Sequence, residues 1–296
     1  MPGPGDVALA PVLGTTRAGA VSAESSRDLL ITVLGELMAP SGGTAWTQTL
    51  TATLDLLGIQ DKAARQAIGR LHDRGWLRRE RVGRQTRQRL TDHSRRLLTD
   101  GAARIYGFGH TGDGWDGRWS IVLASVPEAK RNLRYRLTVG LTWAGFGSLG
   151  QGTWISPWPS REPEAARVLA ELGVEGAAAF RAELGQVGTP KELAARAWDL
   201  AEIDGRYRAF LAELAATPLP GPAGDDDPAA AVRQLVLLVH RWRRFPFLDP
   251  DLPAELLPAD WPGHRAAAAF GERRAAWGPA AAAWWAETDA RFDPDG

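Results

Sequence analysis

Long side chains that end in hydrogen-bond donors recur at helical spacing shortly after residue 60. At 100° per residue, Lys62, Arg65 and Gln66 fall on one face of a helix, with Arg70 at the edge of that face. In the major groove, Arg can form two hydrogen bonds to guanine and Gln two to adenine, each pair contributing about 1–3 kcal/mol of discrimination. A charged helix face is also common on helices that bind nothing. The spacing therefore permits base recognition without requiring it.

The opposite face of this segment is apolar. Ala64, Ala67, Ile68 and Leu71 follow the spacing of an amphipathic helix that packs on a small core. Asp61 is expected to cap the helix, because its side-chain oxygen can accept a hydrogen bond from a free backbone N–H of the first turn. One packed face and one donor-rich face are typical of a recognition helix, which enters the major groove near its N-terminus.

A basic hairpin is predicted directly after this helix. Residues 76–82 and 85–90 read as two short strands, and Gly83 supplies the backbone freedom that the tight turn needs. Side chains two apart share a face of a strand, which pairs Arg79 with Arg81 and Arg87 with Arg89. We expect these arginines and the helical donors to form one outward surface. The expected DNA-binding residues are Lys62, Arg65, Gln66, Arg70, Arg79, Arg81, Arg84, Arg87 and Arg89.

Charge is distributed unevenly along the chain. Residues 60–104 hold 13 Lys and Arg against 5 Asp and Glu, a net charge of +8 (13 − 5). The 296-residue chain has 35 of each kind, so the remainder sums to −8. A cationic module in a neutral chain has the electrostatic footprint of a surface that binds duplex DNA. Together with the helix and hairpin, this charge favours a DNA-binding regulator over an enzyme.

Composition excludes several other classes of protein. The chain has no Cys, so disulfides, thiolate metal sites and Cys nucleophiles are absent. No apolar run approaches the roughly 20 residues of a membrane-spanning helix, and no signal peptide is recognisable, so we expect a cytoplasmic protein. The five His are scattered without metal-ligand spacing, and the Asp225–Asp227 run lies beside Gly and Pro, as in a solvated loop. We expect neither a catalytic site nor a metal site nor a bound cofactor.

The whole chain is predicted to be a multi-domain α+β protein. A winged helix-turn-helix is expected first, then a linker, a ferredoxin-like domain and a helical domain for effector binding and dimerisation. A disordered tail is expected over 1–24 and the winged helix-turn-helix over 25–106. The linker is expected over 107–117, the ferredoxin-like domain over 118–190 and the helical domain over 191–296. The expected helices outside the basic module are 25–39, 91–106, 127–145, 162–172, 191–216, 229–244, 264–277 and 280–289. The expected strands of the ferredoxin-like domain are 118–126, 146–149 and 152–158.

An unusual number of tryptophans, 13 in all, suggests a binding pocket for an aromatic or acyl group. Arginines after residue 240 would then bind an anionic part of the ligand. The alternative is that the indole rings simply fill domain cores. The candidate pocket tryptophans are Trp154, Trp158, Trp198, Trp242 and Trp261. The candidate anion ligands are Arg241, Arg243 and Arg244.

Several stretches resemble the PaaX-type repressors of phenylacetic acid catabolism. They are SSRDLLITVLGE, KAARQAIGRLHDRGWLRRERVGRQTRQRLT, WDGRWSIVLASVPE, GTWISPWP, AWDLAEIDGRYRAFL and, most distinctive, RRFPFLDPDLPAELLPADWPG. The resemblance spans nearly all of residues 25–285. It implies a middle domain similar to the Cas2 fold, and a homodimer on a palindromic operator that an aryl-CoA thioester such as phenylacetyl-CoA releases. The resemblance does not assign effector contacts residue by residue. The candidates for that role in this chain are Trp154, Trp158, Trp242, Arg243 and Arg244.

Two other functions remain to be weighed. Similarity to Cas2 raises the possibility of a metal-dependent nuclease, in which an Asp ends the first strand, two residues before a Pro-Glu pair. Ser125 occupies that position here and cannot supply a charged metal ligand. The other alternative is a DNA-binding protein without a small-molecule sensor, whose C-terminal part serves assembly only.

Overall fold

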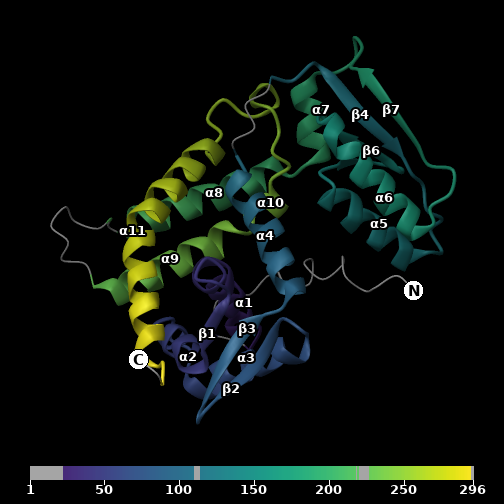
Figure 1. Cartoon of the computed structure of the whole chain (residues 1–296). Coiled ribbons are helices and arrows are strands. Elements are labelled where there is room, and N and C mark those ends of the chain that lie inside the picture. Colours follow the sequence, from purple (N-terminus) through teal and green to yellow (C-terminus); the bar gives the residue numbers. More distant parts are fainter. Residues whose placement is uncertain (1–22, 110–113, 218, 220–226, 295–296) are drawn as a thin grey trace. The chain divides into compact units, whose positions relative to one another are not determined.

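The computed structural model describes residues 23–109, 114–217, 219 and 227–294, which form two compact units (Figure 1). The first unit holds the chain up to Gly107, Leu214–Arg244 and the part from Ala268 onward; the second holds Phe108–Glu213 and Phe245–Ala267. Except for residues 23 and 24, the expected tail lies outside the described residues, as do most of the Asp225–Asp227 run and part of the expected linker. The segment expected as one helical domain contributes to both units.

The first unit begins with a helix that fills its core. α1 (Ala23–Val33) continues as a π-helical segment, Leu34–Met38, and together they match the helix expected over 25–39. Leu30, Val33 and Leu34 are completely buried. The elements that follow are β1 (Thr44–Trp46), α2 (Thr47–Leu56), α3 (Asp61–Asp73), β2 (Leu77–Val82), β3 (Gln85–Leu90) and α4 (Asp92–Gly107).

Burial along α3 follows the apolar stripe predicted from its sequence. Its buried residues are Ala64, Ala67, Ile68 and Leu71. The expected cap is wrong: Gln60 occupies the N-cap position without a side-chain hydrogen bond, and Asp61 is the first helical residue. The Asp61 carboxylate still lies at the positive end of the helix dipole.

A three-stranded antiparallel sheet in the order β1-β3-β2 accompanies these helices. β2 and β3 form the predicted hairpin, with Gly83 at φ 58°, a left-handed conformation that favours glycine. β2 is therefore one of the two edge strands, with one side unpaired by the sheet. α9 (Pro228–Trp242) and most of α11 (Gly263–Arg291) complete the first unit.

The second unit contains a four-stranded antiparallel sheet in the order β5-β6-β4-β7. The chain runs β4 (Arg118–Leu123), α5 (Arg131–Trp143), β5 (Gly147–Gly150), β6 (Thr153–Ser156), α6 (Glu162–Leu172) and β7 (Ala178–Glu183). Leu141 and Ala165 pack with Trp154 in one apolar core, so both helices cover the same face of the sheet. α5 and α6 are in close contact, because a Cβ at Gly140 would lie 2.5 Å from Val168 Cγ1.

Three elements of the C-terminal half differ from expectation. β7 was not predicted. The expected helix 191–216 divides into α7 (Pro190–Ala197) and α8 (Leu200–Ala215), because Trp198 has an extended backbone. The two helices expected at 264–277 and 280–289 are one continuous helix, α11, with Pro279 inside it. α10 (Phe245–Leu248) and two 3-10 turns, Pro159–Arg161 and Ala254–Leu256, complete the described elements. No helix within the described ranges is both long and apolar enough to cross a membrane.

Candidate nucleic-acid interface

The donor-rich face of α3 is open to solvent, as predicted. Lys62, Arg65 and Gln66 are exposed, and Arg70 is half-buried. Arg65 Nε donates a hydrogen bond to Asp61 Oδ2 at 2.7 Å. The two residues form an ion pair across one turn of the helix. Since both side chains are more than half exposed, the pair contributes little stability. Arg65 can therefore exchange Asp61 for another anion.

The register of the hairpin divides its arginines between two faces. Directly opposed residues of an antiparallel pair share a face, and the register pairs Arg79 with Gln88 and Glu80 with Arg87. We call the two sides the inner and outer faces of the ribbon. The inner face carries Arg79, Arg81, Thr86 and Gln88. The outer face carries Arg78, Glu80, Arg87 and Arg89. The expectation that all the arginines share one outward surface is therefore wrong, because the two strands alternate in opposite phase.

The inner face lies opposite α3. A hollow of about 190 Å³ is lined by Arg65 and Ile68 of α3, by Thr47, and by the inner-face residues Arg79, Thr86 and Gln88. Thr47 Oγ1 donates to the Thr86 carbonyl at 3.0 Å, and Gln88 Nε2 donates to Thr47 Oγ1 at 3.0 Å. These bonds fix the ribbon against the start of α2. They leave the Arg65 and Arg79 side chains around the same small hollow.

The outer face is occupied by the end of α11. The Arg87 guanidinium lies over the Trp46 ring, 4.9 Å from its centroid, and donates to Thr44 Oγ1 at 3.2 Å. Its nitrogens lie 3.7 Å from Asp289 Oδ2 and 3.8 Å from Asp293 Oδ2. Arg87, which the sequence assigns to DNA, is thus held between an aromatic ring and two carboxylates of its own chain.

Asp289 also caps α2 from a distant part of the sequence. Its Oδ1 accepts a hydrogen bond from the Trp46 backbone N–H at 2.9 Å and another from Thr49 Oγ1 at 2.7 Å. Trp46 is the N-cap residue of α2 and has no side-chain cap of its own. A carboxylate at a helix N-terminus both satisfies free donors and complements the helix dipole. Asp289 thereby joins α11, α2 and the ribbon.

The remaining ribbon arginines are exposed. Arg89 Nη2 pairs with Glu80 Oε2 across the outer face at 3.3 Å. Arg81 Nε makes a long contact of 3.4 Å with the Gly83 carbonyl, and Arg84 lies at the tip. Within the described part of the chain, no ion pair engages Lys62, Arg79 or Arg84. These cations are accessible to an external anion.

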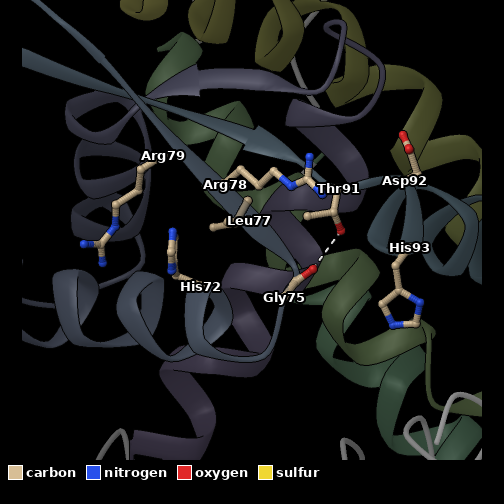
Figure 2. A pocket seen from close by; sticks show the side chains of 8 residues that line it. All are labelled: His72, Gly75, Leu77, Arg78, Arg79, Thr91, Asp92 and His93. Atoms are coloured by element: carbon tan, nitrogen blue, oxygen red, sulfur yellow. Dashed lines mark hydrogen bonds between the residues drawn. The ribbon is translucent and has the colours of Figure 1, made fainter. Parts of the chain in front are cut away.

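A second and larger hollow, of about 550 Å³, lies beside β2 (Figure 2). Its side chains come from the end of α3, the start of β2 and the start of α4. Thr91 Oγ1 donates to the Gly75 carbonyl at 2.7 Å and fixes the turn at its base. The lining residues are His72, Gly75, Leu77, Arg78, Arg79, Thr91, Asp92 and His93. Arg79 belongs to both hollows.

The candidate effector residues do not come together in one described cavity. Trp154 is buried in the core of the four-stranded unit, and the Trp158 Nε1 donates to the Asp251 carbonyl at 2.7 Å. Both belong to the second unit, whereas Trp242, Arg243 and Arg244 belong to the first. Trp242 stacks on Phe270, with centroids 4.7 Å apart. In the second unit, Trp198 stacks on Trp119 and Trp261 meets Tyr207 edge to face.

Arg243 lies in a buried polar cluster of the first unit. Burial lowers the pKa of Arg243 to about 10, while the Asp28 carboxylate opposes that shift. Burial also raises the pKa of Asp28, against the lowering effect of Arg243 and Arg27. His240 has its pKa lowered to about 3, by burial first and then by the neighbouring arginines, so its imidazole is neutral near pH 7. Asp28 is thus the carboxyl group whose charge acts on Arg243 against burial and the neighbouring arginines.

A second buried pair lies in the distinctive Phe-Pro-Phe-Leu-Asp stretch. Tyr207 Oη donates to Asp249 Oδ2 at 2.7 Å, and the Asp251 backbone N–H donates to Asp249 Oδ1 at 2.7 Å. Burial raises the pKa of Asp249 to about 6, although the Tyr207 hydrogen bond lowers it. Tyr207 also stacks on Phe245, with ring centroids 4.2 Å apart. These contacts give the stretch a structural role in the second unit.

Ser125 occupies the position at which the nuclease interpretation requires an Asp. Ser125 lies just after β4 and is exposed. Among the residues that the structure describes, no group of three or more His, Cys, Asp or Glu side chains is placed to hold a metal ion. The sequence interpretation missed His72, Arg78 and Asp289. A helical projection places His72 beside Arg65, but no local pattern links Asp289 to a helix 243 residues earlier.

The first unit carries a basic helix and ribbon, and the second contains an antiparallel four-stranded sheet. This combination is typical of a DNA-binding regulator. Comparisons with known proteins give the family. The model described as PaaX-like protein matches residues 25–94, the PaaX central Cas2-like domain matches 112–194, and the PaaX-like C-terminal domain matches 198–287. The chain belongs to the PaaX family.

Individual relatives agree with this assignment. The chain is 32% identical over 248 residues to the transcriptional repressor PaaX of Escherichia coli (strain K12), covering 82% of this chain and 77% of that protein. An uncharacterized protein from Mycobacterium tuberculosis has a similar solved structure, with a TM-score of 0.57 and 23% identity. That likeness covers 92% of this chain and 99% of the other, and it concerns the fold alone.

Proposed function

We propose that this protein is a DNA-binding transcriptional repressor of the PaaX type and not an enzyme. The observation that carries the proposal is the exposed donor face of α3 opposite the inner-face arginines, in a family whose Escherichia coli member is a transcriptional repressor. In this proposal α2, α3 and the β2–β3 ribbon act as a winged helix-turn-helix. α3 enters the major groove, and the ribbon contacts the backbone or minor groove.

The proposal includes a homodimer. Two recognition helices that read a palindromic operator enter successive major grooves about 34 Å apart. The second unit, with its β-α-β-β-α-β order, is proposed as the ferredoxin-like domain. Sedimentation of the protein alone and with operator DNA tests the stoichiometry, and one protomer per operator would contradict it.

Footprinting on the DNA that flanks its own gene tests the DNA-binding function. We expect a protected palindrome and an affinity that falls steeply with salt, because each neutralised phosphate releases counterions. A protein that protects no sequence, and binds duplex DNA no better than a neutral protein of the same size, would contradict the proposal. The expected site of action is the cytoplasm.

Effector control is the finer part of the proposal. An acyl-CoA thioester would have to prefer the released form by several kcal/mol to move most of the protein off its operator. A thermal-shift series with phenylacetyl-CoA, other acyl-CoA thioesters and free CoA tests this, with stabilisation by one thioester expected. Burial of Trp154 and Trp242 in the cores of different units favours a second candidate, a repressor without a sensor. Stabilisation by none of the thioesters would support that candidate.

A further inference from the structure

The two hollows of the basic module are neighbours that share one lining residue, Arg79. The smaller lies between α3 and the inner face of the ribbon, and the larger lies at the C-terminal end of α3 and the edge of β2. The Arg79 side chain lines both. Because β2 lies at one edge of its sheet, Arg78 of the outer face also lines the larger hollow. We call the two hollows together, with Arg79 between them, the α3–ribbon groove.

Cations predominate along this groove. Arg65, Arg78 and Arg79 line it, together with two histidines, whereas Asp92 is its one acidic lining residue. Arg65 is paired only with the exposed Asp61. Within the described residues, no ion pair or side-chain hydrogen bond engages Arg78 or Arg79. The groove therefore favours an anion from outside the chain.

The geometry of α3 gives the groove a length. His72 follows Arg65 by seven residues, which returns it to within about 20° of the same face and about 10 Å further along the helix axis. Phosphates of one DNA strand succeed each other every 3.4 Å along the duplex axis. A groove bordered by Arg65 at one end and His72 at the other is thus long enough for more than one phosphate.

We propose that the phosphodiester backbone of one DNA strand lies in the α3–ribbon groove, with Arg79 on a central phosphate and Arg78 and His72 on its neighbours. The inference rests on the proposed function and deepens it. It assigns His72 and Arg78 to the interface, and it separates them from Arg87 on the outer face. A DNA strand that passes between α3 and the ribbon is the backbone that separates the major groove, which α3 would enter, from the minor groove, which the ribbon would contact.

The test compares Arg79→Gln, Arg78→Gln and His72→Gln with Arg96→Gln on the duplex that footprinting defines. Arg96 is an exposed arginine of α4 that lines neither hollow, so its variant controls for loss of one charge. We expect Arg79→Gln to weaken binding about tenfold at 0.15 M salt and to reduce the salt slope by about one unit. Arg78→Gln and His72→Gln should weaken it a few-fold, and Arg96→Gln less than twofold.

Duplexes with single uncharged methylphosphonate linkages locate the contact. At the phosphate that Arg79 binds, the loss caused by Arg79→Gln should disappear, because both partners of one interaction have then been removed. A loss of equal size at every linkage would overturn the proposal. So would equal effects of Arg79→Gln and Arg96→Gln, since these would reflect net charge only.

Inorganic tripolyphosphate separates a DNA groove from a site for a small anion. Stabilisation of the wild type but not of Arg79→Gln, combined with an unchanged DNA affinity of that variant, would overturn the proposal. If the wild type binds no duplex at all, the proposed function fails. If the wild type binds with the expected salt dependence while all three groove variants match the wild type, only this inference fails.

Discussion

The two faces of the β2–β3 ribbon carry the same kind of side chain in different settings. Arg79 on the inner face borders a hollow opposite α3 and is engaged by no ion pair among the described residues. Arg87 on the outer face lies over Trp46 and against Asp289 and Asp293. The two residues are eight positions apart in the sequence. Arg79 is available to a ligand, whereas Arg87 maintains the fold. Strand phase and the presence of α11 decide which role an arginine takes.

Removal of the Asp289 carboxylate should have the largest effect. Asp289→Ala deletes two hydrogen bonds at the start of α2 and leaves Arg87 without its nearer carboxylate. We expect a loss of about 2–3 kcal/mol in the free energy of unfolding, measured by urea denaturation. Asp293→Ala is the matched control, because the Asp293 carboxylate is more exposed than that of Asp289 and also lies near Arg87, at 3.8 Å. Equal effects of the two substitutions would show that the Asp289 hydrogen bonds to α2 add no stability beyond the contact with Arg87.

Arg87→Gln should come next, and it separates the two faces directly. Loss of the contact with Trp46 and the two carboxylates is expected to reduce stability by about 1 kcal/mol. The salt slope of DNA binding should stay within experimental error of the wild type, unlike that of Arg79→Gln. A slope lower by about one unit would show that Arg87 leaves its carboxylates and neutralises a phosphate.

Asp61→Asn should strengthen DNA binding modestly. The substitution frees Arg65 from its intrahelical ion pair, which is worth about 0.2–0.5 kcal/mol, and removes a negative charge from the recognition face. We expect an affinity about two- to threefold higher on the operator in a fluorescence anisotropy titration. Asp73→Asn at the other end of α3 provides the comparison. A weaker complex would mean that the Asp61–Arg65 pair itself positions the guanidinium for binding.

Arg89→Gln should have the smallest effect. Arg89 and Glu80 are both about half exposed, and such pairs contribute roughly 0–1 kcal/mol. We expect thermal unfolding of this variant within about 2 °C of the wild type. A loss of stability as large as that of Arg87→Gln would mean that the outer face is held together along its whole length.

Local patterns allowed much of the basic module to be predicted from sequence. The buried stripe of α3 has a period set by the helix itself, and Gly83 supplies the left-handed conformation that the hairpin turn uses. The relative phase of two strands depends on the turn register, which the alternation within each strand does not fix. The sequence interpretation therefore paired the arginines of each strand correctly and placed the two pairs on one surface wrongly.

Other errors arose where tertiary contacts override local propensity. β7 has the composition Ala-Ala-Phe-Arg-Ala-Glu, with no β-branched residue, and it is a strand because it pairs with β4 along six residues. Pro279 was expected to end a helix, yet α11 continues through it with Trp277 and Trp285 buried on either side. The contacts of Asp289 with α2 join residues 243 positions apart, so no local pattern predicts them.

The cap that Asp289 provides has a consequence for the timing of folding. Trp46 and Asp289 are 243 residues apart, so at 5–20 residues per second a ribosome needs roughly 10 to 50 s to make the second after the first. Until then α2 has a free N-terminus and Arg87 has no Asp289 beside it. We therefore expect the nascent basic module to stay loosely assembled, and to reach its duplex-competent form only after the codon for Asp289 has been translated.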